Sequence, residues 1–395
     1  MAKKTINKEL TGAQDLYNFL FEACNIIRGP VSQDNFKDYI TPLLYYKRIS
    51  DVYDEETEEA LISSGGDKEY ASLPEQHRFV IPDGCHWQEV RERTENLGAA
   101  IVGAMRQIEI ANPDTSYGNK DYPADLMGDA YEILLKKFAD DSKAQAGEFY
   151  TPRSVVRLLV HILDPQPGET VYDPACGSGG MLIEAIRYMH DDSLCCGSIF
   201  GQEKNVVNAA IAKMNLFLHG ASDFNVMQGD TLRDPKILQG GNIAKFDCVI
   251  ANPPFSLENW GATEWSSDKY KRNIYGTPSD SCGDYAWIQH MICSMSSGKG
   301  RMAVVMPQGI LFRGNQEAEI RKQLVESDLI EAVVTLGDKL FYGTGLSPCF
   351  LIIRRMKQAH HSGRILMIDG SKILTQKRAQ NILEENDIDR LYSLL

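Results

Sequence analysis

The chain has 395 residues, enough for two or three domains that each have a core. Its 43% hydrophobic and 24% charged residues are typical of an ordinary soluble protein. The formal net charge of −13 argues against a chain that grips long nucleic acid unaided, because phosphate binding needs clustered Lys and Arg. It does not exclude a chain that handles nucleic acid together with a more basic partner.

The sequence carries no targeting or metal signal. It has no run of eighteen apolar residues, and MAKKTINKEL lacks an apolar core, so we expect neither a membrane helix nor a signal peptide. Its nine cysteines are scattered and form no CxxC, which indicates a reduced, cytoplasmic protein. The histidines form no HExxH motif, so we expect no metal site.

The first part of the chain has the apolar spacing of helices. Leu16, Leu20, Cys24 and Ile27 follow one another at nearly helical intervals. These patterns predict helices over 13–29, 35–56, 97–111 and 124–141. We therefore expect an N-terminal helical domain over residues 1–145.

From Gly147 onward, short apolar runs alternate with helical stretches. The pattern predicts strands over 170–175, 198–203, 225–230, 246–252, 301–307, 329–336 and 349–355. Helices are expected between them, over 178–190, 206–220 and 285–297. Such alternation predicts an α/β, doubly wound domain, here 146–375, with a parallel sheet covered by helices on both faces. Folds of this kind bind ligands at the ends of the strands.

A glycine-rich turn follows the first predicted strand. Gly177, Gly179 and Gly180 allow a tight turn directly before a helix. Such a turn suits a phosphate or any ligand that needs the backbone close by, and it can also be a plain packing turn. The spacing departs from G-x-G-x-x-G, because Leu182 stands at the sixth position. Asp173 before the turn disfavours a pyrophosphate and favours a cationic ligand or one that carries a ribose or an amine.

Acidic residues end the first three strands. Glu203, at the end of the second strand, is placed to accept hydrogen bonds from both hydroxyls of a ribose. Asp230 ends the third strand, where it can accept from an adenine amine. Each acid alone can be a solvated loop residue. Together with Asp173 they describe an adenosine pocket.

The segment GEFYTP precedes the first strand. Thr151 is a candidate helix N-cap, and Pro152 suits the first helical position. This is a sufficient structural reason for Thr-Pro. Phe149 and Tyr150 then lie on the loop before the helix, near the end of the first strand.

The fourth predicted strand ends in the rigid segment NPPF. Proline donates no ladder hydrogen bond, so the strand must end at Asn252, which Pro253 holds extended. A planar ligand with an amine can stack on Phe255 while the amine donates to the Asn252 side-chain oxygen and the Pro253 carbonyl. The alternative is a plain turn after a strand.

These motifs resemble those of a known family. Asp173-Pro-Ala-Cys-Gly-Ser-Gly-Gly180 with Asn252-Pro-Pro-Phe255 resembles the amino-methyltransferases that use S-adenosylmethionine. The order GEFYTP, glycine loop, NPPF resembles the gamma group of N6-adenine DNA methyltransferases. The segment ITPLLYYKRISDVYDEE and the late stretch 301–355 look like the methylation subunit of type I restriction–modification systems. The resemblance covers almost the whole chain.

The resemblance implies a Rossmann-like S-adenosylmethionine-dependent methyltransferase fold and a role for each matching residue. The cofactor S-adenosylmethionine would be held at its methionine part by 148–153 and the glycine loop, with Glu203 on the ribose and Asp230 near the adenine. The cofactor-binding set is then Glu148, Phe149, Tyr150, Thr151, Pro152, Arg153, Asp173, Ala175, Gly177, Ser178, Gly179, Gly180, Glu203 and Asp230. The catalytic set, which holds the target adenine, is Asn252, Pro253, Pro254 and Phe255.

The resemblance also implies partners. The substrate would be double-stranded DNA with an adenine flipped out, and a specificity subunit would read the sequence. A restriction (nuclease) subunit and a second methylation subunit would complete the complex. Residues 376–395 would form a C-terminal helical tail that is short for the family.

The stretch 256–287 is long, polar and aromatic. Its aromatic and basic residues can contact the flipped base and nearby phosphates, in which case the loop would be mobile without DNA. These residues are Trp260, Trp265, Lys269, Tyr270, Lys271, Arg272, Tyr275 and Tyr285. The alternative is an ordinary surface insertion.

Two other functions remain open from the sequence. The first is a protein or small-molecule amide or amine N-methyltransferase, since some protein-glutamine methyltransferases have a motif similar to NPPF. The second is a catalytically silent scaffold subunit. A nicotinamide dehydrogenase is disfavoured by NPPF and by the broken glycine spacing.

Overall fold

The sheet and helices that carry the strand-end motifs lie in the second of two compact units. One unit comprises 1–141 with 217–223, the other 142–216 with 224–395. The structure, a computed structural model, describes residues 36–93, 97–112, 151–189, 198–219, 221, 223–341, 347–377 and 381–395. The expected limits at 145/146 and 375/376 stay predictions.

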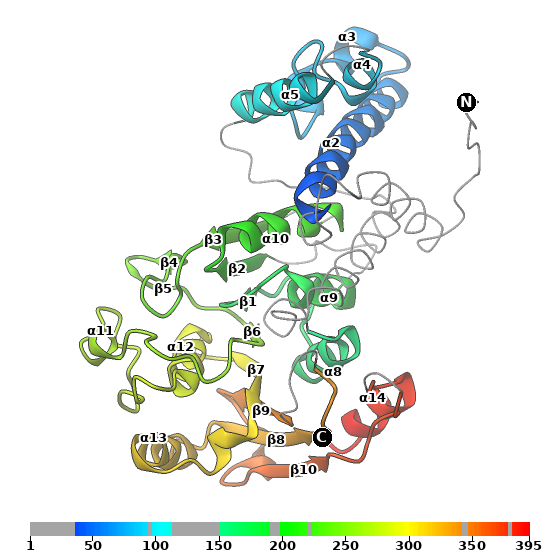
Figure 1. Cartoon of the computed structure of the whole chain (residues 1–395). Helices are drawn as coiled ribbons and strands as arrows, with labels where there is room; N and C mark the ends of the chain where they lie inside the picture. Colours follow the sequence, from blue (N-terminus) through cyan, green and yellow to red (C-terminus); the bar gives the residue numbers. More distant parts are fainter. Residues whose placement is uncertain are drawn as a thin grey trace. The chain divides into compact units, whose positions relative to one another are not determined.

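The described part of the first unit is helical (Figure 1). Its elements are α2 (Phe36–Ser63), α3 (Lys68–Ala71), η2 (Pro74–Gln76), α4 (Trp87–Arg91) and α5 (Leu97–Ala111). Tyr46 on α2 is buried against Trp87, whose ring centroid lies 5.3 Å away. The helices expected over 35–56 and 97–111 are confirmed, and those expected over 13–29 and 124–141 lie outside the described residues.

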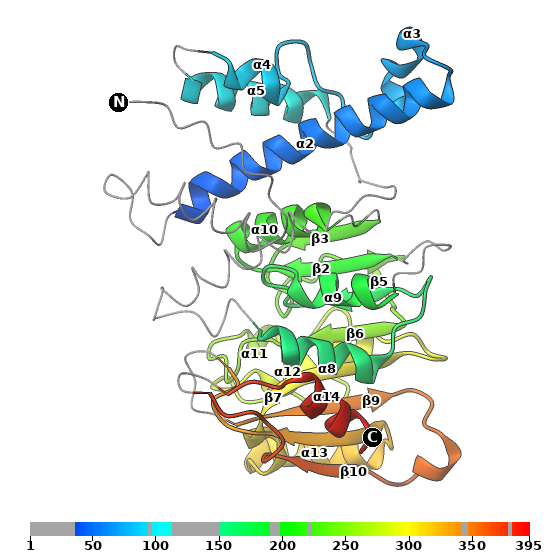
Figure 2. The same ribbon diagram turned by 90° about the vertical axis from the view of Figure 1, so that its right-hand side faces the viewer.

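The second unit is built on an eight-stranded sheet, whose strands follow one another along the vertical direction of Figure 2. Their order across the sheet is β10-β8-β9-β7-β6-β1-β2-β3. The strands are β1 (Val171–Asp173), β2 (Ile199–Glu203), β3 (Phe224–Gln228), β6 (Cys248–Ala251), β7 (Arg301–Pro307), β8 (Ile330–Leu336), β9 (Pro348–Arg354) and β10 (Leu366–Gly370). Every strand expected from the alternation is present.

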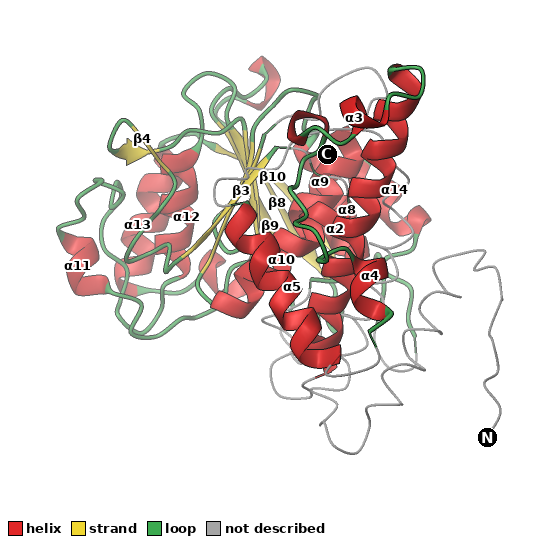
Figure 3. Cartoon of the chain, turned by 90° about the horizontal axis from the view of Figure 1, so that it is seen from above, coloured by secondary structure: helices red, strands yellow, loops and turns green. Residues whose placement is uncertain are grey.

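Helices cover both faces of the sheet, which Figure 3 shows edge-on. One face carries α8 (Arg153–Leu163), α9 (Gly180–Met189) and α14 (Glu385–Tyr392), and α10 (Val206–Leu218) packs beside the start of α9. The other face carries α12 (Asp284–Ser294) and α13 (Asn315–Glu326), with α11 (Ala262–Ser266) in the loop before α12. The short helices η3 (Gln308–Leu311) and η4 (Ala359–His361) follow β7 and β9.

The sheet differs from the expected fully parallel one at β9. This strand lies between β7 and β8 and is antiparallel to both. Parallel neighbours need a long crossover connection, and residues 337–347 between β8 and β9 are too few for one. The apolar residues of β9 are buried, as in its parallel neighbours, so composition alone does not reveal the strand direction.

Three short strands were not expected. β4 (Leu238–Gln239) and β5 (Asn242–Ile243) form a hairpin of two residues each, below the length at which a pattern can be recognised. β10 is an edge strand in which Ile368 and Gly370 are buried, so its apolar signal is weak.

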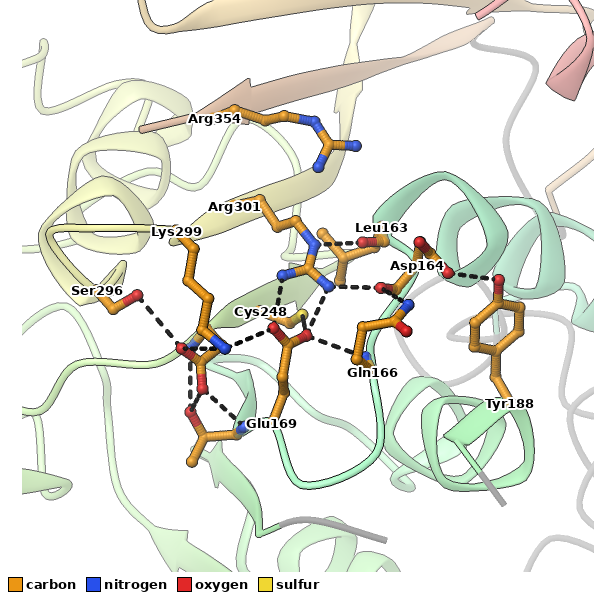
Figure 4. A network of polar contacts seen from close by, with 12 residues as sticks. Leu163, Asp164, Gln166, Glu169, Tyr188, Cys248, Ser296, Lys299, Arg301 and Arg354 are labelled. Carbon is orange, nitrogen blue, oxygen red and sulfur yellow. Dashed lines mark hydrogen bonds and ion pairs between the residues drawn. The ribbon is translucent and has the colours of Figure 1, made fainter. Parts of the chain in front are cut away.

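A network of charged groups joins the amino ends of β1, β6 and β7 (Figure 4). Arg301 at the start of β7 donates to Glu169 at 2.6 Å and to the carbonyls of Leu163 and Asp164 at the end of α8. Thr170 and Asp247 exchange hydrogen bonds beside it. The network anchors the edge of the sheet that lies opposite the carboxyl ends of these strands.

No described helix has the length and hydrophobicity that a membrane crossing requires. Within the described ranges, no group of three or more His, Cys, Asp and Glu residues is placed to hold a metal ion.

Candidate active site

The strand order creates a crevice between β1 and β6. From β1 the chain adds β2 and then β3 on one side, whereas β6 and β7 lie on the other side. Crevices at the carboxyl ends of strands where the winding reverses are where doubly wound sheets bind ligands. The motifs that contain Asp173 and Asn252 follow these two strands and therefore meet at this point.

A pocket lies at this crevice. It is lined by Thr151, Val156, Asp173, Ala175, Cys176, Gly177, Ser178, Gly180, Met181 and Asn252. Tertiary folding thus brings together one residue before α8, the glycine turn after β1 and the residue after β6. Val156, Cys176 and Met181 are apolar lining residues that the sequence analysis did not single out as ligand contacts.

The glycines of the turn have different structural roles. Gly177 (φ 53°) and Gly179 (φ 85°) adopt backbone conformations that favour glycine. A Cβ at Gly179 would make an ordinary contact with Ala212 of α10 at 3.5 Å, so the backbone conformation, and not a lack of space, favours glycine there. A Cβ at Gly177 or Gly180 would meet no protein atom within 4 Å, so these two glycines leave open space beside the pocket.

Asp173 is a buried acid in the pocket wall, with a relative exposure of 2%. Its Oδ1 accepts from the backbone N–H of Ala175 at 2.9 Å. Burial, with a smaller contribution from Glu203, raises the pKa of Asp173 to about 8, although the Ala175 hydrogen bond opposes the shift. A positive or hydrogen-bond-donating ligand group in the pocket would stabilise its carboxylate.

Glu203, at the end of β2, supports the glycine turn. Its Oε2 accepts from the N–H of Gly177 at 3.0 Å and its Oε1 from the N–H of Asn205 at 2.8 Å. Each carboxylate oxygen has a second lone pair, so the group can still accept from a ligand. Glu203 is therefore adjacent to the pocket without being one of the residues that line it.

Asp230, after β3, is held by contacts with neighbouring residues. Its carboxylate pairs with Lys204 at 2.9 Å and accepts from the N–H groups of Leu232 and Arg233 at 3.2 and 3.3 Å. Like Glu203, it is not one of the residues that line the pocket.

Asn252 directly follows β6, and its amide has a defined orientation. Nδ2 donates to the hydroxyl of Thr151 at 2.9 Å. Oδ1 is buried and accepts no hydrogen bond from a described residue. A buried acceptor without a donor is costly, so this oxygen is prepared to receive a ligand's N–H.

The expected cap of α8 is wrong by one residue. The helix begins at Arg153 and Pro152 is its N-cap residue, with no side-chain cap. Thr151 lies one residue earlier, and its hydroxyl accepts from Asn252 instead of capping the helix. Arg153 pairs with Glu184 at 3.7 Å and does not line the pocket. Glu148, Phe149 and Tyr150 lie outside the described residues.

The prolines lead from Asn252 into a fixed turn. Pro253 is buried, and Pro254 and Phe255 are partly buried. Ser256 then adopts a left-handed conformation with φ 49°, which is uncommon for a residue other than glycine. Phe255 is not among the pocket-lining residues.

The expectation that the aromatic and basic residues of 256–287 can contact DNA does not hold for its largest side chains, because they are buried. Trp260, Trp265 and Tyr285 are 1–2% exposed and belong to the hydrophobic core that also contains other residues of α12. Arg272 is 1% exposed, stacks on Trp265 at 4.4 Å and pairs with Asp268 at 2.7 Å. Lys269 and Lys271 are exposed, so they are the basic residues of this stretch that can reach a partner.

Comparisons with known proteins identify the family. Residues 123–395 match the model of the family described as N-6 DNA methylase, and residues 16–149 match that of the HsdM N-terminal domain. The chain belongs to the N-6 DNA methylase family. The family resemblance that the motifs carry is therefore confirmed.

Relatives and solved structures agree with this family. The chain is 38% identical over 278 residues to the MjaVII type I restriction enzyme methylase subunit of Methanocaldococcus jannaschii, covering 68% of this chain and 47% of that protein. This chain thus spans about half the length of that curated relative. A type I restriction-modification methyltransferase subunit from Streptococcus thermophilus aligns with a TM-score of 0.78 and 25% identity, covering 97% of this chain and 92% of the other.

A more distant structure supports the fold class. A protein of Listeria monocytogenes, described as a class I S-adenosylmethionine-dependent methyltransferase, aligns with a TM-score of 0.53 at 16% identity, covering 90% of this chain and 91% of the other. The expected α/β methyltransferase fold is confirmed by this likeness and by the sheet itself. In this N-6 DNA methylase, the glycine turn and NPPF thus occupy the carboxyl edge of a methyltransferase sheet.

Proposed function

We propose that this chain is the methylation subunit of a type I restriction–modification system. It transfers a methyl group from S-adenosylmethionine to N6 of an adenine flipped out of double-stranded DNA. The observation that carries the proposal is the buried Oδ1 of Asn252, which has no described donor and lines the same pocket as the glycine turn.

The pocket residues fit S-adenosylmethionine. Gly177 and Gly180 leave space where a side chain would block a ligand. Asp173 offers a buried carboxyl that a cationic ligand would stabilise, and Glu203 retains free lone pairs beside the turn. The cofactor supplies a methyl group on a positively charged sulfur. We assign Thr151, Asp173, Ala175, Gly177, Ser178 and Gly180 to its binding, with Glu203 on the ribose.

Asn252 and the Pro253 carbonyl would hold the target amine. The lone pair of adenine N6 is delocalised into the ring, so the nitrogen is a poor nucleophile. Two acceptors, each of which accepts a hydrogen bond from one of its N–H groups, favour a more pyramidal nitrogen. The lone pair of that nitrogen is then available to attack the methyl group. Thr151 orients the Asn252 amide with Oδ1 free, and the prolines keep the acceptors rigid. The reaction needs no covalent enzyme intermediate.

The target adenine must leave the duplex for this chemistry. Flipping costs a few kcal/mol, which contacts to the extruded base must offset. Phe255 offers an aromatic face for stacking, and base–aromatic stacking is worth about 1–3 kcal/mol. Positioning of the amine then supplies most of the rate acceleration.

Partners would supply sequence recognition. We propose a specificity subunit that reads DNA, a nuclease subunit and a second methylation subunit in the complex. The net charge of −13 supports a chain that depends on a partner for DNA affinity. The described cysteines are free, which supports a reducing compartment, the cytoplasm.

Methylome sequencing of cells that co-express this chain with its specificity subunit tests the proposal. We expect N6-methyladenine at one defined sequence with the wild type and none with Asn252→Ala. The matched control is Asn242→Ala, an exposed asparagine on β5, which should methylate normally. Unchanged methylation in Asn252→Ala, or no adenine methylation by the wild-type complex, would refute the proposal.

A further inference from the structure

The turn directly after NPPF is fixed by residues far away in the sequence. Ser256 has φ 49°, a conformation that costs free energy for a residue with a side chain. Its backbone N–H donates to Asp284 Oδ1 at 2.7 Å. Asp284 is the first residue of α12 and has a relative exposure of 0%.

The second oxygen of Asp284 is held by Arg313. Arg313 Nη1 donates to Asp284 Oδ2 at 2.6 Å, and Nη2 donates to the hydroxyl of Ser256 at 3.2 Å. Ser256, Asp284 and Arg313 therefore form a closed cycle, which we call the Ser256 clamp. A buried carboxylate needs such pairing, because an unpaired charge away from water is strongly destabilising.

The surroundings of Arg313 are built to hold its guanidinium in this position. Gly309 on η3 has no side chain, and a Cβ there would lie 2.5 Å from Arg313 Nε. Arg321 on α13 donates to the carbonyl of Arg313 at 2.9 Å. Glu317 contributes a second carboxylate at 3.4 Å from Arg313 Nη1. Backbone and side chain of Arg313 are thus both anchored.

The clamp acts one residue beyond Phe255. Ser256 is held through both its backbone N–H and its hydroxyl. Phe255 is the preceding residue, so the backbone position from which its ring extends is defined as well. Arginine suits this role because its planar fork can donate to two acceptors at once, which a lysine cannot do in the same geometry.

We propose that Arg313 is a positioning residue for methyl transfer: through Asp284 it holds the turn at Ser256 and thereby places Phe255 against the flipped adenine. The inference rests on the proposed function. It adds Asp284 of α12 and Arg313, which lies between η3 and α13, to a site that the motifs alone confine to 252–255.

Two kinds of variant test the clamp in the full-length chain. Arg313→Met removes both donors, and Arg313→Lys keeps the charge but reaches one acceptor. Gly309→Ala keeps Arg313 and displaces its guanidinium. The matched control is Arg354→Met, because Arg354 is similarly exposed (27% against 29%) and pairs with Glu331 at the amino edge of the sheet.

Hydrogen exchange measures the clamp directly. We expect faster exchange of the Ser256 amide in Arg313→Met and Gly309→Ala, because Asp284 is no longer fixed, and unchanged exchange there in Arg354→Met. This readout does not depend on catalysis. Unchanged exchange at Ser256 in Arg313→Met would overturn the proposal.

Single-turnover methylation measures the consequence, with the reconstituted complex and a duplex that contains its methylome-defined site. We expect the rate to fall about tenfold to hundredfold in Arg313→Met, as for a displaced reacting group, and less in Arg313→Lys. S-adenosylmethionine affinity should stay within about twofold, since the clamp lies outside the pocket lining.

The outcomes distinguish a failure of the positioning role of Arg313 from a failure of the proposed function. A normal rate in Arg313→Met, with wild type active and Ser256 exchange accelerated, would overturn the positioning role while the proposed function stands. An equal loss of rate in folded Arg354→Met would overturn it as well. An inactive wild-type complex would refute the proposed function, and with it the role assigned to Arg313.

Discussion

Asn252 donates through Nδ2 to the hydroxyl of Thr151, 2.9 Å away, while its buried Oδ1 accepts no hydrogen bond from any described residue. The two residues lie 101 positions apart in the sequence, and both line the pocket. Thr151 therefore decides which end of the amide faces a ligand. This relationship links the segment before α8 to the proposed chemistry and leads to the first prediction.

Thr151→Val should slow methyl transfer because it removes the acceptor for Asn252 Nδ2. The lost hydrogen bond is worth about 1.4 kcal/mol, which corresponds to a roughly tenfold lower rate. Thr151→Ser, which keeps the hydroxyl, should remain within about twofold of the wild type. Single-turnover rates of the reconstituted complex measure both, and equal rates for the valine and serine variants would contradict the proposed orientation.

Binding of S-adenosylmethionine should release a proton and tighten as pH rises from 6 to 8. In the free protein, burial raises the pKa of Asp173 to about 8, so the carboxyl is mostly protonated at pH 6. A cationic ligand favours the carboxylate and lowers that pKa, so binding expels the proton. Calorimetric titrations in buffers of different ionisation enthalpy measure the number of protons released on binding. Asp173→Asn should abolish the pH dependence, and proton uptake on binding would exclude this linkage.

Gly180→Ala should weaken cofactor binding without destabilising the fold. Gly180 begins α9, and an added Cβ would meet no protein atom within 4 Å, so it would occupy open space beside the pocket. We expect at least a tenfold loss of affinity, about 1.4 kcal/mol. Gly103→Ala on α5 is the control, because a Cβ there also meets open space. Thermal unfolding should show both variants at least as stable as the wild type, because alanine favours helix more than glycine does; retained affinity in Gly180→Ala would place the ligand elsewhere.

Glu169→Gln should destabilise the sheet at neutral pH. Burial of Glu169 raises its pKa, but hydrogen bonds from Arg301, the Gln166 N–H and Lys299 outweigh this and lower it to about 2 (Figure 4). The charged pair therefore stabilises the protein above about pH 4.5, and this contribution is lost as pH falls towards 2.

Denaturant titrations from pH 7 to pH 3 measure the effect of Glu169→Gln. We expect a loss of roughly 2–4 kcal/mol at pH 7, because Arg301 is left buried beside a neutral group. The difference from wild type should shrink below pH 4. Glu326→Gln, at an exposed position on α13, should cost less than about 0.5 kcal/mol at both pH values. A Glu169→Gln difference that does not depend on pH would show that packing, not charge, explains its effect.

Local chemistry explains why much of the fold and site could be read from the sequence. Proline has no N–H for the hydrogen-bond ladder of a sheet, so NPPF predicts the end of a strand. The glycines of 177–180 predict a turn before a helix. Strand and helix periodicity likewise act over a few residues. The seven expected strands and the helices α9, α10 and α12 follow from such signals, whereas β4, β5 and β10 do not.

Non-local contacts explain where expectations failed. The stretch 256–287 is polar and aromatic, which is typical of an exposed loop, yet Arg272 is buried by carbonyls of Thr231 and Leu232 at 2.8 and 2.7 Å. Those acceptors follow β3, far from Arg272 in the sequence. The direction of β9 depends on the short connection 337–347 and on the neighbouring strands β7 and β8. The buried apolar residues of β9 do not reveal it.

The sequence by itself determined the chemistry that is available: the amide and prolines of 252–254, the acid at 173 and the glycines that leave room for a ligand. These depend on side-chain identity and on backbone limits within a few residues. Only the tertiary structure decided which groups act together. Thr151 orients Asn252, and Asp284 together with Arg313 holds Ser256, because hydrogen bonds join residues that local sequence patterns cannot relate. The tertiary structure also leaves Asp230 outside the pocket lining.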